Sequence, residues 1–205
     1  MNKTMPGRGR RPGRPDSRQA VLDAARRRFL ADGYQAVTMR SIAADAGVDA
    51  ALVSYFFGSK QALFGAAMQL NANPAELIAT ALDGDLAGLP ERLLRTLLAV
   101  WDDPERGAPL RALVSGVGQE PAIARMMREV LEREMIAPIA KRIGGPDAEF
   151  RAGVVAAQLS GIVFSRYLLQ VEPVASASAE RLVELLAPAL ARVLRAPRRA
   201  DTGAR

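Results

Sequence analysis

The sequence predicts an all-α protein with about nine to ten helices. Apolar residues recur at intervals of three and four through most of its 205 residues. Gly, Pro, Asn and Asp interrupt these runs, most strongly at Gly144-Gly145-Pro146, and Ser, Thr or Asp precede several of them as candidate N-caps. No stretch alternates convincingly between apolar and polar residues, so we expect no strands.

The composition restricts the kinds of site that the chain can build. It contains no cysteine and no histidine, which removes disulfides, thiolate ligands, the commonest metal ligand and the usual general base. We therefore expect no catalytic residue, no metal and no cofactor. No apolar stretch follows the basic start, and the longest apolar run, residues 152–164, is shorter than the roughly 20 residues that span a bilayer. The expected location is the cytoplasm, without membrane contact.

The net charge of +6 lies entirely in the N-terminal part of the chain. Residues 1–60 hold 11 Lys and Arg against 5 Asp and Glu, whereas residues 61–205 hold 17 of each kind. A basic head on a neutral body is typical of a phosphate-binding module joined to another domain, although a solvated basic tail without a partner would give the same composition. We expect four segments, namely a flexible basic arm at 1–16, a small helical domain at 17–64, a larger helical domain at 65–196 and a disordered tail at 197–205.

Short helices follow the arm, and polar caps and glycines mark their ends. The pattern predicts a helix from about 18 to Gly33, a second from 39 to 46, a third from 50 to 56 and a fourth from 60 to about 70, and the candidate N-caps are Ser17, Thr38, Asp49 and Ser59. Gly47 fits the turn between the second and third helices. This is the arrangement of a helix-turn-helix, whose last helix enters the major groove. Spacing alone does not separate it from an ordinary αα-hairpin.

The stretch from Thr38 to Leu63 reads TMRSIAADAGVDAALVSYFFGSKQAL. It resembles the signature of the tetracycline-repressor family, with its Thr–x–Arg helix start, Ile-Ala pair, Ala-Gly-Val and aromatic-rich Phe–x–Ser-Lys. The specific resemblance covers residues 17–64, and the rest of the chain agrees with the family in length and helix content. It implies a homodimeric bacterial transcriptional regulator. We expect a repressor that a small hydrophobic effector releases from double-stranded, palindromic operator DNA, with residues 65–196 as the effector-binding and dimerisation domain.

The resemblance also implies which residues contact the DNA backbone. Thr38 and Arg40 at the second helix and Lys60 at the fourth would contact phosphate, next to helix N-termini that favour anions. Taken singly, each of these residues reads better as a cap or a solvated surface side chain, and it is their position around the same turn that favours contact with phosphate. In the arm, Arg11 and Arg14 stand in a Pro- and Gly-rich stretch that looks like a hook for a narrow minor groove.

The third helix carries few groups that can read a base. Ser54 stands where the family commonly has a groove-facing tyrosine, and only Ser54 and Tyr55 are polar. Tyr55 fits packing and base recognition equally well. Ala50 and Ala51 are expected at thymine methyl groups.

The larger domain supplies candidates for a pocket and an interface. Large adaptable side chains predict an effector pocket, although ordinary core accounts for each of them singly; the candidates are Leu98, Trp101, Met127, Leu131, Gln158, Phe164 and Tyr167. The family resemblance implies a four-helix dimer interface built on the helices at 147–171 and 178–194. Its expected residues are Val155, Leu159, Val163, Arg166, Leu182 and Leu186. A long helix buried wholly within one subunit is the alternative.

Two further functions stay open at this point. A dimeric DNA-binding protein whose body only dimerises would share every feature of the basic head. A small helical enzyme or scaffold with a basic tail would account for the arm but not for the pattern from Thr38 to Lys60.

Overall fold

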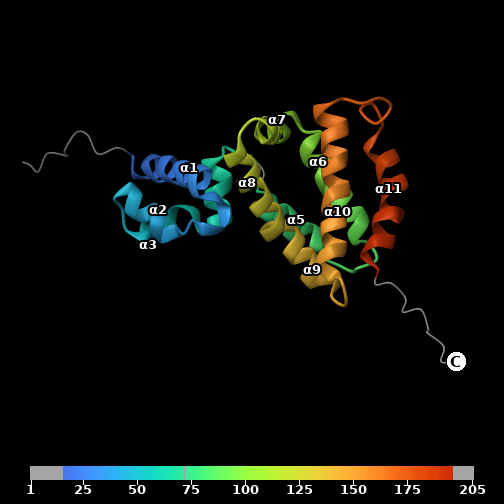
Figure 1. Cartoon of the computed structure of the whole chain (residues 1–205), viewed down its shortest axis with the longest axis horizontal. Coiled ribbons are helices and arrows are strands. Elements are labelled where there is room, and N and C mark those ends of the chain that lie inside the picture. The colour runs from blue at the N-terminus through green and yellow to red at the C-terminus, as the bar shows by residue number, and fades with distance from the viewer. Residues whose placement is uncertain (1–15, 72, 196–205) are drawn as a thin grey trace, which may run out of the picture.

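The computed structural model describes residues 16–71 and 73–195, and within them every regular element is helical (Figure 1). The predicted all-α fold with a helix-turn-helix head and a helical body is therefore confirmed. The head contains α1 (Ser17–Ala36), α2 (Met39–Ala46), α3 (Ala50–Phe57) and α4 (Lys60–Ala67). The body contains α5 (Pro74–Leu82), α6 (Leu89–Trp101), α7 (Pro104–Ser115), the 3-10 turn η1 (Gly116–Gly118), α8 (Pro121–Val130), η2 (Leu131–Ile136), α9 (Ala137–Ile143), α10 (Ala148–Val163), η3 (Phe164–Leu168) and α11 (Ala179–Leu194). None of the helices described is long and apolar enough to cross a membrane.

Polar caps start the helices of the head, as predicted, with one exception. The Thr38 hydroxyl accepts from the Ser41 backbone N–H at 3.1 Å, and the Ser41 hydroxyl accepts from the Thr38 N–H at 3.1 Å. This reciprocal capping box fixes the start of α2. Asp49 and Ser59 cap α3 and α4 through the same kind of contact. At α1 the cap is Asp16 rather than the predicted Ser17, which is already the first helical residue.

Gly33 interrupts α1 without ending it. Its φ of 84° is in the left-handed region, as the predicted helix end requires, but one further helical turn follows to Ala36. A Cβ atom at Gly33 would lie 2.7 Å from both carboxylate oxygens of Glu129 on α8. The position therefore needs glycine twice, for its backbone angle and for the close approach of α8.

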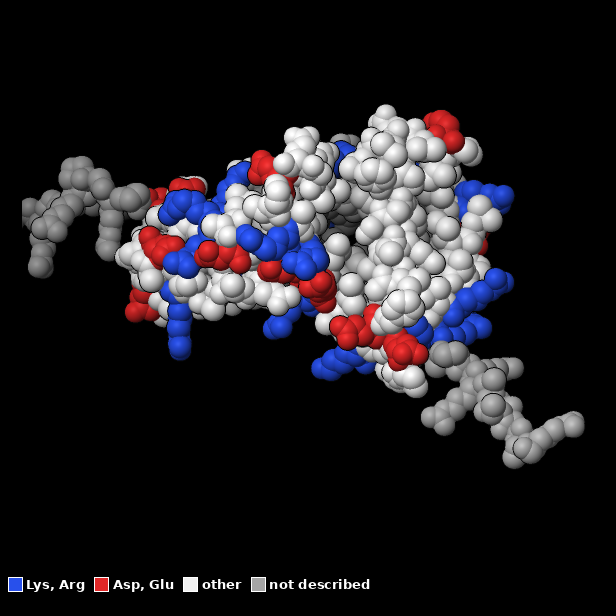
Figure 2. Space-filling model, viewed as in Figure 1, with Lys and Arg blue, Asp and Glu red and all other residues white. Residues whose placement is uncertain are grey.

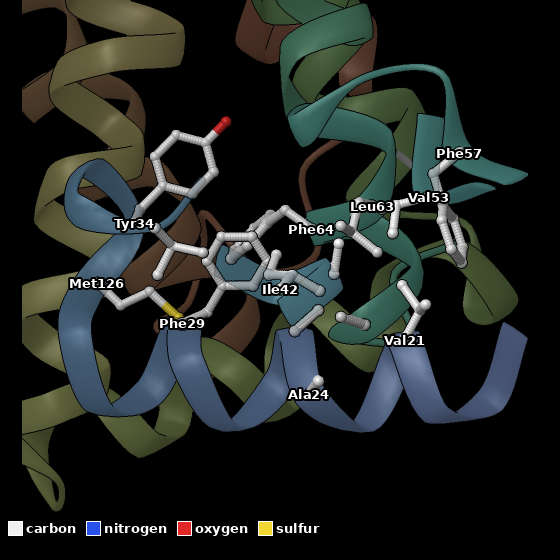
Figure 3. Packing of buried hydrophobic residues seen from close by; sticks show 14 of the residues in the cluster. Val21, Ala24, Phe29, Tyr34, Ile42, Val53, Phe57, Leu63, Phe64 and Met126 are labelled. Atoms are coloured by element: carbon white, nitrogen blue, oxygen red, sulfur yellow. The ribbon is translucent and has the colours of Figure 1, made fainter. Parts of the chain in front are cut away.

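The core of the head includes a residue from the body. Phe29, Tyr34 and Phe64 pack together with ring centroids 5.1–5.8 Å apart, and Met126 of α8 is inserted beside Phe29 with no exposed surface (Figure 3). Val130, one turn further along α8, belongs to the same cluster. The head thus has no complete core of its own, because α8 closes it. The predicted domain boundary after residue 64 also falls inside α4.

The core of the body lies between α6, α10 and α11, with α5 and α9 against it (Figure 1). Four of the predicted interface residues, Val155, Leu159, Val163 and Leu182, are buried in the subunit's own clusters at 0–7% exposure. Leu186 packs against the same core. Arg166 donates to the carbonyls of Val174, Ala175 and Ala177 and pairs with Asp102, which ties down the connection before α11. The prediction that Val155, Leu159, Val163 and Leu182 face a partner is wrong, because their side chains are buried inside one subunit. Leu186 and Arg166 are only partly buried, and their place in an interface stays a prediction.

Two helical stretches of the body contain π-helical turns. Residues 121–143 form α8, the π-helix η2 and α9, and the predicted helix at 147–171 divides into α10 and the π-helix η3. A π-helical turn contains an additional residue and often occurs at a functional site. Both segments border the same internal space, η2 through Leu131 and Met135 and η3 through Phe164.

The insertion of Met126 into the head core leads to a stability prediction. Met126→Ala is expected to lower the free energy of unfolding by about 2–5 kcal/mol, because a fully buried side chain is lost. Met127→Ala is the matched control, and a smaller loss is expected since Met127 is only partly buried and lines a cavity. Urea denaturation of the two variants measures the difference. Equal losses would contradict the inclusion of Met126 in the core.

Candidate nucleic-acid interface and internal cavity

One face of α3 points to solvent while the other anchors the helix. Val53 and Phe57 are buried in the head core, and Ala51, Ser54 and Tyr55 are exposed on the opposite side. The Tyr55 side chain is 82% exposed, so packing does not account for its presence. This face has the width and position of a groove-reading helix, with a hydroxyl, a phenol and a methyl group to offer. The predicted Ala50 is partly buried and packs against the head core instead.

The residues predicted to contact phosphate differ in their surroundings. Thr38 and Arg40 are exposed at the first turn of α2. Because the Thr38 hydroxyl only accepts in the capping box, its proton stays free to donate. Lys60 is already engaged inside the protein. Its Nζ donates to the carbonyl of Gln35 at 3.2 Å and lies 4.6 Å from the ring centroid of Tyr34, and burial lowers its pKa. Its contact with phosphate stays a prediction, as does that of Arg11 and Arg14, which lie outside the described residues.

The body encloses a cavity of about 660 Å³ between α5, α6, α7, α8, η2 and α10. This volume is in the range of sites that bind small organic molecules. The side chains around it are mostly apolar, and four lining residues, Thr96, Arg128, Glu134 and Ser160, have polar side chains. The apolar wall includes Leu77, Ile78, Leu93, Leu97, Val100, Trp101, Leu110, Val114, Met127, Leu131, Met135, Val163 and Phe164.

Sequence reasoning found part of this wall. Trp101, Met127, Leu131 and Phe164 line the cavity, as predicted. Three other candidates do not, namely Leu98, Gln158 and Tyr167. Leu98 is turned into the body core, and Gln158 is on the exposed side of α10. Tyr167 lies behind the wall, where its ring packs at a tilt against Trp101 with the centroids 5.4 Å apart, and its hydroxyl donates to Asp102 at 2.9 Å. Burial and the nearby Asp102 carboxylate raise the pKa of Tyr167.

Sequence reasoning missed the polar groups of the cavity, and it also missed the contribution of α5 and α7 to the cavity wall. Glu134 and Arg128 occur in a charged stretch that reads as a solvated face, and no local pattern shows that η2 turns Glu134 toward the cavity. In the part of the chain described, no group of three or more acidic side chains could hold a metal ion.

Helix α8 and η2 contact the head on one side and the cavity on the other. The guanidinium of Arg125 donates to the Ala31 carbonyl at 2.6 Å, and Glu129 accepts from the Gln35 backbone N–H at 2.7 Å. These contacts satisfy backbone groups that the break at Gly33 leaves without helical partners. Further along, the Tyr34 hydroxyl donates to Glu134 at 2.6 Å. Since Glu134 also lines the cavity, one residue joins the cavity to the head.

An exposed recognition helix carried by a body with an internal cavity defines a helix-turn-helix transcriptional regulator that responds to a ligand. The family model described as "Bacterial regulatory proteins, tetR family" matches residues 21–67, and the one described as "Tetracyclin repressor-like, C-terminal domain" matches residues 87–194. The second match alone spans more than half of the chain. The chain therefore belongs to the tetracycline repressor family.

Individual relatives agree with this assignment in their sequences. The HTH-type transcriptional regulator BetI of Agrobacterium fabrum is 30% identical over 83% of this chain and 85% of its own length. The protein of the same name from Burkholderia mallei is 28% identical over 83% of this chain and 94% of its own. A TetR-family regulator of Streptomyces coelicolor, known from a crystal structure, is 36% identical over 91% of this chain and 98% of its own, with a TM-score of 0.47.

Tyr55 provides a direct test of the recognition face. Tyr55→Ala should leave the free energy of unfolding nearly unchanged, because the side chain is exposed, while it weakens binding to the protein's own operator by about 1 kcal/mol or more. Fluorescence anisotropy with labelled operator DNA measures this change. Leu86→Ala, which removes another exposed apolar side chain in the connection before α6, is the control and should bind as the unaltered protein does. If the two variants bind equally well, Tyr55 is not in the interface.

Proposed function

We propose that this regulator binds a palindromic operator as a homodimer and leaves it when a small apolar molecule occupies the cavity of about 660 Å³. The observation that carries the proposal is the double use of α8 and η2. Met127, Leu131 and Met135 line the cavity, Met126 completes the core of the head, and Val130 of the same segment belongs to both. A molecule that reshapes one side of this segment acts on the other, because packed cores change between discrete arrangements rather than deforming continuously.

On DNA, the exposed face of α3 would enter the major groove. Ala51, Ser54 and Tyr55 would read bases, and Thr38 and Arg40 would contact the adjoining phosphates. With so few polar readers on α3, the arm would contribute much of the affinity through Arg11 and Arg14, which are proposed to lie in the neighbouring minor groove.

The dimer surface is proposed on the outward faces of α10 and α11. Phe150 and Ala157 stand two helical turns apart on the exposed side of α10, and Leu185 is 58% exposed on α11. In Figure 2 the surface over α10 is free of charge, with charged side chains along its margins. An uncharged exposed surface of this kind is typical of an interface between subunits.

Charged substitutions on this surface test the dimer. Ala157→Glu and Leu185→Glu should each yield monomers, because a buried unpaired carboxylate is costly in an interface, and the monomers should bind the operator weakly since each has only one head. Leu86→Glu, at an exposed leucine in the connection before α6, is the control and should remain dimeric. Light scattering coupled to gel filtration gives the oligomeric state. Dimers of both interface variants would place the interface elsewhere.

The ligand response has its own experiment. Genomic DNA fragments from the organism that carries the gene are retained on the protein and sequenced, which yields the operator. A panel of neutral, anionic and cationic amphiphiles is then screened by quenching of Trp101, the single tryptophan of the chain, which lines the cavity. At least one compound that binds should weaken operator binding, and the operator should weaken its binding by the same factor. If every compound that binds leaves operator affinity unchanged, the body serves only to dimerise.

A further inference from the structure

Glu134 belongs to two sites at once. It lies in the wall of the cavity, on η2, and its Oε1 accepts a hydrogen bond of 2.6 Å from the hydroxyl of Tyr34. These two residues are 100 positions apart in the sequence. Tyr34 is only 2% exposed and belongs to the core of the head. The carboxylate of Glu134 is therefore a polar point of contact between the cavity and the head, beside the apolar contact that Val130 makes with both.

The ring of Tyr34 also contacts Lys60, at the start of α4. The Lys60 ammonium lies 4.6 Å from the centroid of the Tyr34 ring and donates to the Gln35 carbonyl. Burial and Arg133 lower the pKa of Lys60, whereas the carboxylates of Glu134 and Glu129 raise it, so that Lys60 is within electrostatic reach of the cavity wall. Removing the free negative charge of Glu134 would affect the phenol and the ammonium together.

The charges around the cavity indicate what kind of ligand could do this. Arg128 also lines the cavity, but its side chain is exposed, and a solvated guanidinium binds an anion weakly. Glu134 is partly buried among Leu131, Met135 and the ring of Tyr34, where a carboxylate attracts a cation more strongly than it does in water. A ligand with an apolar body and a cationic group would satisfy both the wall and this carboxylate.

We propose that Glu134 is the residue through which an effector releases the DNA, and that this effector carries a protonated amine on an apolar body. The inference rests on the proposed function and specifies its ligand and its first step. The ammonium group takes the Glu134 carboxylate from Tyr34. The buried phenol then lacks its acceptor and Lys60 lacks a neighbouring negative charge, which favours a geometry of the head in which Tyr34 and α4 have moved. The effector thus binds the DNA-free geometry better than the DNA-bound one.

Three probes of equal chain length test the ligand class: decylammonium, decanol and decanoate, the two ions used below their micelle concentrations and decanol below its solubility limit. In the unaltered protein, quenching of Trp101 should show decylammonium binding at least about tenfold more tightly than decanol or decanoate. Decylammonium alone should weaken operator binding, by a factor of about 5 to 150. Glu134→Gln should abolish the preference for the amine. Glu132→Gln, on the exposed side of the same segment, is the matched control and should retain it.

Tyr34→Phe tests whether the hydrogen bond between Tyr34 and Glu134 transmits ligand binding to the head or only stabilises the structure. Without a hydroxyl to compete for Glu134, this variant should bind decylammonium more tightly, yet operator affinity should no longer respond to it. If decylammonium releases the operator from Tyr34→Phe as it does from the unaltered protein, the proposed transmission through Tyr34 is overturned. If all three probes bind equally well and decanol also releases the operator, the effector does not need an amine, and the proposed function still stands. If no probe binds or alters operator affinity, both the inference and the proposed ligand response fail.

Discussion

The contact between the end of α1 and helix α8 is the constraint on which the rest of the structure depends. Gly33 breaks α1 at a φ of 84° and leaves backbone groups of the last turns without helical partners. Arg125 and Glu129 supply those partners from α8. Because Met126 of the same helix also completes the head core, the head cannot change its orientation without breaking hydrogen bonds and opening that core.

This constraint bears on the route that we propose between the cavity and the head. The sequence suggests α4 as the lever, since it is the helix that leads from the head into the body. The structure adds a shorter route, in which Tyr34 touches both Glu134 at the cavity and Lys60 at the start of α4. In the proposed release, α4 would respond to the wall formed by α8 and η2 rather than act alone. A ligand needs to alter only the wall, provided that it favours one of the two geometries.

Local signals in the sequence predict much of the head but little of the cavity. Thr38, Asp49 and Ser59 cap helices because each acts on N–H groups two or three residues away, and such spacing is visible in the sequence. The faces of α10 are not visible in this way. The helix is apolar nearly all round, so periodicity cannot tell that Val155 and Leu159 face their own core while Ala157 faces outward. The pair of Tyr34 and Glu134 gives no local signal at all, because the fold alone brings the two residues together.

The π-helical turn at η2 explains why regular helical spacing does not predict that Glu134 borders the cavity. In a regular helix, residues four positions apart share a face, so that Met126, Val130 and Glu134 would all point at the head. Each extra residue in the turn rotates the remainder of the helix by about 100°. Glu134 therefore lies at the change of register, where it reaches Tyr34 on the head side and also borders the cavity. The carboxylate is therefore open to the cavity while it accepts a hydrogen bond from a phenol of the head, which is the condition that the proposed release of DNA requires.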